Sequence, residues 1–210
     1  MKAIILDFIN VVADINYKKM IWDLPLKEKF SAIRIFLSLK KIPDIKYVFN
    51  AYQKGLINSY ELEQRIEEFL PNSAYVVPKL LNNINNYINV NEEVLSLVKT
   101  LKQYGIKVVL LSNSIPETED IMNKYDLDYV FDGMVLSNQI GMMKPQRKIY
   151  NHTLSTYDLN PEETLMIDDT KKNLIGANEV EIKTIQCKNS KQTCDVLNCY
   201  LNYLETSHQM

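Results

Sequence analysis

The chain has no excess of basic residues and no long apolar run. Its 210 residues include 24 Lys and Arg against 26 Asp and Glu, a formal net charge of -2. Without surplus positive charge, the protein has little with which to neutralise a phosphate backbone or an anionic bilayer, so we expect neither nucleic acid nor a membrane as a partner. No segment approaches the ~20 consecutive apolar residues that a membrane-spanning helix needs.

Cysteines are few. Near the C-terminus lie three of them, Cys187, Cys194 and Cys199, with no Cys-x-x-Cys pair and no histidine cluster that would complete a zinc site. We interpret them as reduced thiols in a reducing, cytoplasmic compartment. A secretory signal in the first residues is the alternative, but Asp7 interrupts the apolar run that such a signal requires.

The sequence does contain short, continuous apolar runs rich in β-branched residues, which are typical of strands buried on both faces of a parallel sheet. Five strands are predicted, at Lys2–Phe8, Lys107–Ser112, Met134–Leu136, Thr164–Asp169 and Lys183–Gln186. Helices are predicted in the second half of the chain at Glu92–Tyr104, Gln146–Tyr157, Lys171–Glu179 and Lys191–Leu204. This alternation indicates an α/β fold with a doubly wound, Rossmann-like, mostly parallel sheet, whose ligand site lies beyond the carboxyl ends of the strands.

Residues 14–90 break the alternation. Their patterns are mostly helical, at Lys27–Leu39, Ile45–Lys54, Ser59–Leu70 and Val77–Tyr87, with Ser59 as an N-cap. We therefore predict an α/β core domain of residues 1–13 and 91–210 and a helical insert of residues 14–90. An insert beside the carboxyl edge of the sheet is well placed to cover a substrate and exclude water.

Polar residues follow the predicted strands or precede a helix at four places. They are Asp7, the pair Ser112-Asn113, Lys144 before Pro145, and the pair Asp168-Asp169. Such residues suit phosphoryl transfer, because an aspartate oxygen can attack phosphorus and form a covalent phospho-enzyme. Since carboxylates alone would repel a phosphate dianion, we expect a Mg²⁺ ion held by Asp7 and one acid of the pair, with Lys144 and Ser112 binding the remaining phosphoryl oxygens.

These four pieces resemble, in order, the four motifs of the haloacid dehalogenase superfamily. They occupy residues 5–12, 109–114, 141–145 and 166–170, so the resemblance extends over the whole chain. The insert is similar to the helical cap that sugar-phosphate phosphatases and dehalogenases of this superfamily carry after the first strand. The first and third motifs are most similar to those of the α-glucose-1-phosphate phosphatase-like proteins.

The resemblance implies a metal site. Asp7 would be the nucleophile and a metal ligand, and Asp169 would be the second direct ligand. Asp168 would reach the ion through water, and the backbone carbonyl of Ile9 would complete the protein's share.

The resemblance also implies a phosphate site for a small phosphorylated metabolite. Ser112 and Asn113 would hold the phosphoryl group, Lys144 would orient Asp7 and neutralise charge, and Asn173 would support the loop after the fourth motif.

One residue departs from the family pattern. Most phosphatases of the family have a second aspartate two residues after the nucleophile, where this chain has Ile9. A positioned acid-base is typically worth ~10² to 10⁴ in rate. We therefore expect a preference for esters whose leaving oxygen needs little protonation, such as sugar 1-phosphates.

Two alternatives remain open at this point. The first is that the chain is a degenerate relative that binds a phosphate ligand or a protein partner without turnover, and the second is that it is a haloacid dehalogenase. Against the dehalogenase stands the Asp168-Asp169 pair, which those metal-free enzymes do not need.

Overall fold

A five-stranded parallel sheet forms the centre of the molecule. The computed structural model describes residues 1–208, and side chains through residue 206. The strand order is β5-β4-β1-β6-β7. The strands are β1 (Ala3–Leu6), β4 (Lys107–Ser112), β5 (Gly133–Leu136), β6 (Thr164–Asp168) and β7 (Lys183–Gln186), and every neighbouring pair is parallel. The predicted doubly wound α/β fold is confirmed.

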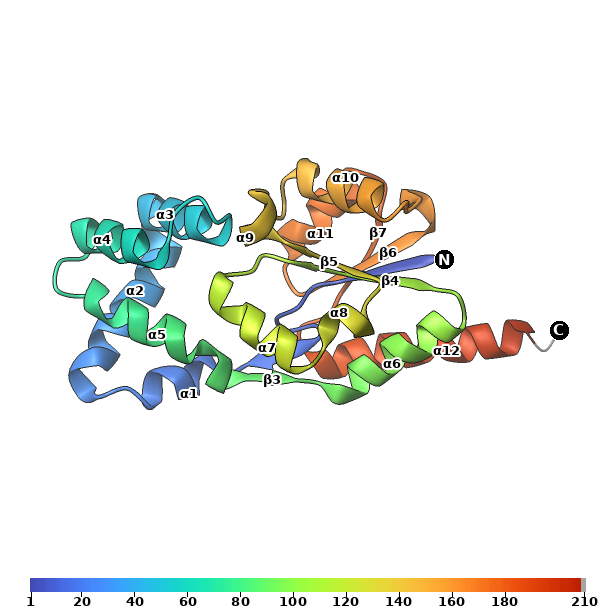
Figure 1. Ribbon diagram of the computed structural model, residues 1–210, viewed down its shortest axis with the longest axis horizontal. Coiled ribbons are helices and arrows are strands. Elements are labelled where there is room, and N and C mark those ends of the chain that lie inside the picture. The colour runs from blue at the N-terminus through green and yellow to red at the C-terminus, as the bar shows by residue number, and fades with distance from the viewer. Residues whose placement is uncertain (209–210) are drawn as a thin grey trace.

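Helices cover both faces of this sheet, as Figure 1 shows. Ile4 and Leu6 of β1 pack in a cluster with α6 (Glu92–Gln103) and α12 (Ser190–His208) on one face. Ile5 packs in another cluster with α10 (Arg147–Thr156) and α11 (Lys171–Asn178) on the other face. Alternate residues of a strand point to opposite faces, so a strand covered on both sides must be apolar throughout, as these are in sequence.

The remaining core helices are short. They are η3 (Pro116–Thr118), α7 (Glu119–Lys124), α8 (Leu127–Val130), α9 (Ser137–Ile140) and η4 (Pro161–Glu163). The last helix, α12, runs to His208 rather than to the predicted Leu204, so the predicted core domain is described as far as residue 208. All three cysteines are free thiols, as expected. No helix within the described residues 1–208 has both the length and the hydropathy to cross a lipid bilayer.

Helices α1–α5 form a group with its own apolar cluster. The bounds are α1 (Tyr17–Trp22), α2 (Leu26–Lys41), α3 (Pro43–Gln53), α4 (Ser59–Phe69), η1 (Ala74–Val76), α5 (Val77–Asn83) and η2 (Ile84–Tyr87). The N-cap of α4 is Asn58 and not Ser59, which is the first helical residue. Asn58 and Glu61 each accept a hydrogen bond from the other's backbone N–H, so two otherwise unpaired donors of the first turn are satisfied together.

A two-stranded antiparallel ladder joins this helical group to the sheet domain. Its strands are β2 (Ala13–Ile15) and β3 (Ile88–Val90). The predicted domain boundary at 13/14 falls within β2, and the one at 90/91 directly follows β3. These two strands are absent from the predicted elements, because each is only three residues long.

A second contact between the two parts involves α9. Gly55 has φ +66°, and a Cβ atom there would lie 2.1 Å from the backbone oxygen of Asn138. Ser137 Oγ donates a hydrogen bond of 2.6 Å to the carbonyl of Gln53. Both the conformation and the close approach therefore require glycine at position 55.

Candidate active site

Three of the predicted site residues lie at the carboxyl edge of the central strands. Asp7 directly follows β1, while Ser112 and Asp168 are the last residues of β4 and β6. Strand β1 lies between β4 and β6, and the Asp7 N–H donates to the Ile167 carbonyl at 3.0 Å. Parallel pairing thus explains why acids far apart in the sequence meet.

Three carboxylates form the centre of the site. One oxygen from each of Asp7, Asp168 and Asp169 lies within 4.8 Å of the other two. Asp7 and Asp168 are buried, and Asp169 is half-buried. Carboxylate oxygens are hard ligands of the kind that Mg²⁺ prefers, so this donor set fits the expected ion.

Lys144 bridges two of these acids. Its Nζ lies 2.7 Å from Asp7 Oδ1 and 2.7 Å from Asp168 Oδ2, and it donates to the carbonyl of Leu111 at 2.8 Å. Only 1% of the residue is exposed. All three donors of the ammonium are therefore used inside the protein.

The Asn113 side chain holds the lysine loop. Asn113 Oδ1 accepts from the backbone N–H of Lys144 at 2.8 Å, and Asn113 Nδ2 donates to the carbonyl of Lys144 at 3.0 Å. Both polar atoms of this amide thus contact residue 144, whose peptide bond to Pro145 is cis. The role expected for Asn113 in holding a phosphoryl group stays a prediction.

The acids outnumber their one buried cation. Burial raises the pKa of Asp7 from 3.8 to about 8, and the charge of Asp168 adds to this, against the opposing effects of Lys144 and the Phe8 N–H. Burial by itself would lower the pKa of Lys144, but the charges of Asp168 and Asp7 outweigh it and raise that pKa. The cluster therefore holds more negative charge than Lys144 compensates, which is a second observation that fits a divalent cation.

Asp168 is saturated with hydrogen bonds, whereas Asp169 is more open. Asp168 Oδ1 accepts from the Thr170 N–H at 2.7 Å, and Asn173 Nδ2 lies 3.1 Å from both oxygens of Asp168. The carbonyl of Asn173 in turn accepts from the buried Tyr150 hydroxyl at 2.7 Å. Asn173 thus supports the loop after β6, with Tyr150 fixing its position.

Sequence reasoning missed two residues near the acids. Asn10 has φ +63° and donates from Nδ2 to Asp169 Oδ2 at 2.9 Å, linking the loop after β1 to the loop after β6. An asparagine just after a strand-end acid is a weak signal for this, because Asn tolerates the left-handed conformation. Tyr17, the first residue of α1, has a pKa raised by burial and then by the charges of Asp169 and Asp7. No sequence signal distinguishes Tyr17 from the other tyrosines.

The side chain of Ile9 lies against the apolar core. It is half-buried and packs on the cluster that contains Leu6 and Leu110. Its only ladder contact is a bridge to Ala13. Position 9 therefore offers a hydrocarbon surface and no titratable group.

Two hollows lie within the helical group or between it and the sheet domain. One, of about 220 Å³, lies within the helical group, and its lining is almost entirely apolar. It is lined by Tyr17, Met20, Ile35, Phe36, Leu39, Phe49, Leu62, Ile66, Val77, Leu80, Leu81, Ile84 and Ile115. The other, of about 570 Å³, is polar and lies between α3 and the Lys144 loop, where Lys46, Lys54 and Lys172 line it together with Asn113 and Lys144.

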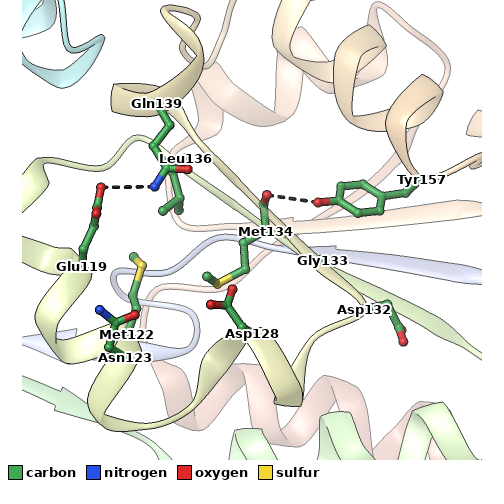
Figure 2. Close-up of a pocket in the computed structure, with 10 residues that line it drawn as sticks. All are labelled: Glu119, Met122, Asn123, Asp128, Asp132, Gly133, Met134, Leu136, Gln139 and Tyr157. Carbon is green, nitrogen blue, oxygen red and sulfur yellow. Dashed lines mark hydrogen bonds between the residues drawn. The ribbon is translucent and has the colours of Figure 1, made fainter.

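A further hollow, of about 400 Å³, lies along the edge strand β5, away from these residues (Figure 2). Gln139 donates to Glu119 at 3.2 Å, and the Tyr157 hydroxyl donates to the Met134 carbonyl at 3.0 Å. None of the predicted site residues lines it.

The chain is similar to a known protein family and to individual members with phosphatase names. The sequence profile of a family described as haloacid dehalogenase-like hydrolase matches residues 36–187. A sesquiterpene phosphatase of Aspergillus oryzae is 33% identical over 101 residues, covering 47% of this chain and 51% of that protein. The pyrophosphatase PpaX of Bacillus mycoides is 30% identical over 95 residues, covering 45% and 44%. The matched stretches thus span about half of these relatives.

Solved structures of other proteins have the same fold, and one of them is a haloacid dehalogenase family enzyme of Bacteroides thetaiotaomicron in complex with magnesium and inorganic phosphate. The TM-score is 0.67 at 22% identity, over 89% of this chain and 93% of that one.

Proposed function

We propose that this chain, which belongs to the haloacid dehalogenase-like hydrolase family, is a magnesium-dependent phosphatase that works through a phosphorylated aspartate. The observation that carries the proposal is the buried Lys144, held at 2.7 Å from both Asp7 and Asp168 beside the half-buried Asp169. The match to two phosphatases, of which one is a pyrophosphatase by name, supports the same reaction class.

Asp7 is the nucleophile in this proposal. Its Oδ1 accepts from Lys144 and from the Phe8 N–H, so we assign the attack on phosphorus to Oδ2. A bond forms between Oδ2 and phosphorus while the bond from phosphorus to the leaving oxygen breaks, and the leaving group departs with the electron pair. Water then attacks phosphorus and releases inorganic phosphate, which restores the carboxylate.

The other residues of the site position the nucleophile and the phosphoryl group and offset their negative charge. Lys144 holds Asp7 in place and Ser112 binds the phosphoryl oxygens, while Asp169, Asp168 and the Ile9 carbonyl would hold the ion. We assign Asp169 as the direct ligand, because each oxygen of the buried Asp168 already accepts two hydrogen bonds, whereas each oxygen of the half-buried Asp169 accepts one. A bound Mg²⁺ would supply the positive charge that offsets repulsion between a phosphate dianion and the carboxylates.

Magnesium is expected to raise the melting temperature of the protein and to be required for hydrolysis of p-nitrophenyl phosphate. Asp169→Asn removes a carboxylate ligand, so it should weaken the affinity for Mg²⁺ by about tenfold or more. Thermal unfolding at a series of Mg²⁺ concentrations measures this affinity. The control is Asp195→Asn, at an exposed position on α12. Equal Mg²⁺ affinity in wild type and Asp169→Asn would contradict the assigned ligand.

The missing acid at position 9 leads to a substrate preference. We propose that the enzyme prefers esters whose leaving oxygen needs little protonation, such as sugar 1-phosphates. Ile9→Asp would restore the acid, and we expect it to raise turnover of an alkyl phosphate by about tenfold or more, with a smaller gain on glucose 1-phosphate. Steady-state turnover on both esters measures this.

Ile9→Asn is the matched control for that change. It introduces a polar side chain of the same size with no proton to transfer, so it shares the cost of placing a polar group against the core. An equal gain in Ile9→Asn and Ile9→Asp would show that proton transfer is not the cause.

The helical group favours a second substrate class. We propose that residues 14–90 act as a cap over the acids, and the cavity inside the cap is lined by apolar side chains. An apolar cavity of about 150 Å³ can bind benzene, so one of about 220 Å³ has room for a larger hydrocarbon group. The name of the sesquiterpene phosphatase points in the same direction.

A small panel of phosphate esters distinguishes sugar 1-phosphates from apolar phosphate esters as the preferred substrate class. Glucose 1-phosphate and 1-naphthyl phosphate both have weakly basic leaving oxygens, but only the second has an apolar group, while glucose 6-phosphate has an alkyl leaving oxygen. A clear preference for the 6-phosphate would count against both classes. Undetectable hydrolysis across the panel with Mg²⁺, combined with binding of a phosphate analogue, would instead favour a non-catalytic binding protein.

A further inference from the structure

Helix α2 presents its large apolar side chains to solvent. Between 42% and 70% of the surface is exposed for Leu26, Phe30, Ile33 and Leu37. The buried residues on the opposite face are mostly smaller or polar: Ser31, Ala32, Ile35 and Ser38. This is the reverse of the usual arrangement, in which the larger apolar face of a surface helix is buried.

The exposed side chains form one continuous stripe. Their spacing of four, three and four residues places them in line along the helix. Trp22, at the end of α1, is 75% exposed, and the ammonium of Lys29 lies 4.8 Å from the centre of its ring, so Trp22 lies beside the first turns of α2. We call Trp22, Leu26, Phe30, Ile33 and Leu37 the apolar stripe. A contiguous exposed apolar patch of this kind marks an interaction surface.

Basic residues flank the apolar stripe on both sides. At 100° per residue, Lys29 and Lys40 fall on one side of it, and Lys27, Arg34 and Lys41 fall on the other. The single acid of α2, Glu28, lies on the opposite side of the helix, where it pairs with Lys79 at 2.7 Å.

Charge is also segregated over the chain. Residues 17–54 contain nine Lys and Arg against three Asp and Glu, a net charge of +6, while the rest of the chain contains 15 against 23. The net charge of -2 is an average over these two parts. The net charge of the whole chain, from which we expected no membrane partner, therefore averages out the basic character of α1–α3.

We propose that the apolar stripe docks on an anionic lipid surface. An amphipathic helix with Trp, Phe and Leu on one face and flanking Lys and Arg lies in the plane of the headgroups, with its apolar side chains among the acyl chains and its charges on anionic lipids. This docking is independent of the chemistry at Asp7.

The charges beside the apolar stripe favour a lipid surface over a second copy of the chain as its partner. Pairing two stripes would bring the flanking lysines of both copies together, and Glu28 lies too far round the helix to offset them. An anionic surface instead pairs with every one of these residues.

Cosedimentation with lipid vesicles tests the proposal on the full chain. We expect binding to vesicles of phosphatidylcholine and phosphatidylglycerol in equal parts, at least about tenfold weaker binding to phosphatidylcholine alone, and weakening with added salt. Phe30→Ser combined with Leu37→Ser should lower the affinity by about tenfold or more. The control is Tyr129→Ser, because Tyr129 is 86% exposed on α8, outside the stripe.

A charge variant provides an independent readout. Lys40→Glu combined with Lys41→Glu leaves the apolar stripe intact and should weaken binding to the anionic vesicles only. The absence of binding to both kinds of vesicle, or equal binding to both, would overturn the proposal. So would a concentration-dependent dimer, seen by light scattering without vesicle binding, that the Phe30→Ser and Leu37→Ser changes dissociate.

Discussion

Asp7→Asn is expected to lower the turnover of p-nitrophenyl phosphate by at least about 10³-fold, because an amide oxygen is a poor nucleophile towards phosphorus. Position 7 lies at the end of the central strand, where Asp7 and the Phe8 N–H are hydrogen-bonded at 2.7 Å and an asparagine oxygen could accept the same bond. The fold should therefore survive, which circular dichroism will show. The exposed Asp195→Asn variant should keep wild-type turnover. If Asp7→Asn does as well, the nucleophile is another residue.

The same variant has an expected effect on stability. The pKa of Asp7 is about 8 in the folded protein and 3.8 in an unfolded chain. A carboxyl whose pKa is raised on folding stabilises the fold fully below pH 3.8, and this contribution is lost as the pH rises to about 8. Asparagine cannot ionise. In EDTA, the melting temperature of Asp7→Asn should therefore fall less than that of the wild type between pH 4 and pH 8. A parallel decline in both proteins would contradict the raised pKa.

Lys144→Met is expected to lower the free energy of unfolding by about 3–5 kcal/mol and to abolish activity. Methionine fills a similar volume but leaves two buried carboxylates, Asp7 and Asp168, without their shared cation. It also leaves the carbonyl of Leu111 without its donor. Urea unfolding in EDTA measures the loss.

Two comparisons separate this effect from that of removing any lysine. Lys172→Met, at an exposed position on α11, should change the free energy of unfolding by less than about 0.5 kcal/mol. Mg²⁺ should restore part of the stability of Lys144→Met, because the ion would carry positive charge to the same carboxylates. Equal urea midpoints for Lys144→Met and Lys172→Met would mean that the buried ion pairs of Lys144 with Asp7 and Asp168 contribute no net stability.

Much of the core was predictable because local pattern and global fold agree there. Strands β4 and β7 match their predicted bounds, since each is a short run between clear turn signals. The convergence of Asp7 with Asp168 and Asp169 was also predictable, because parallel strands place their carboxyl ends at one edge. Sequence thus indicated the acids, and the structure added the distances between them.

The missed features depend on contacts between distant parts of the chain. The bond from Asn10 to Asp169 joins residues that only the folded sheet brings together. In α2, Phe30 and Ile35 are both apolar, and periodicity alone does not tell which face is turned inward. Burial of the face with Ala32 is set by the space between the helices of the group, which no pattern in the sequence records.

The ladder of β2 and β3 has a consequence for how this chain could be shortened. Ile15 and Ile88 are paired neighbours, so the polypeptide leaves the sheet domain and re-enters it at one spot. Two antiparallel strands need only a two-residue turn to connect them. A tight hairpin in place of residues 16–87 would let the backbone pass from Ile15 to Ile88 without altering the course of any strand in the parallel sheet.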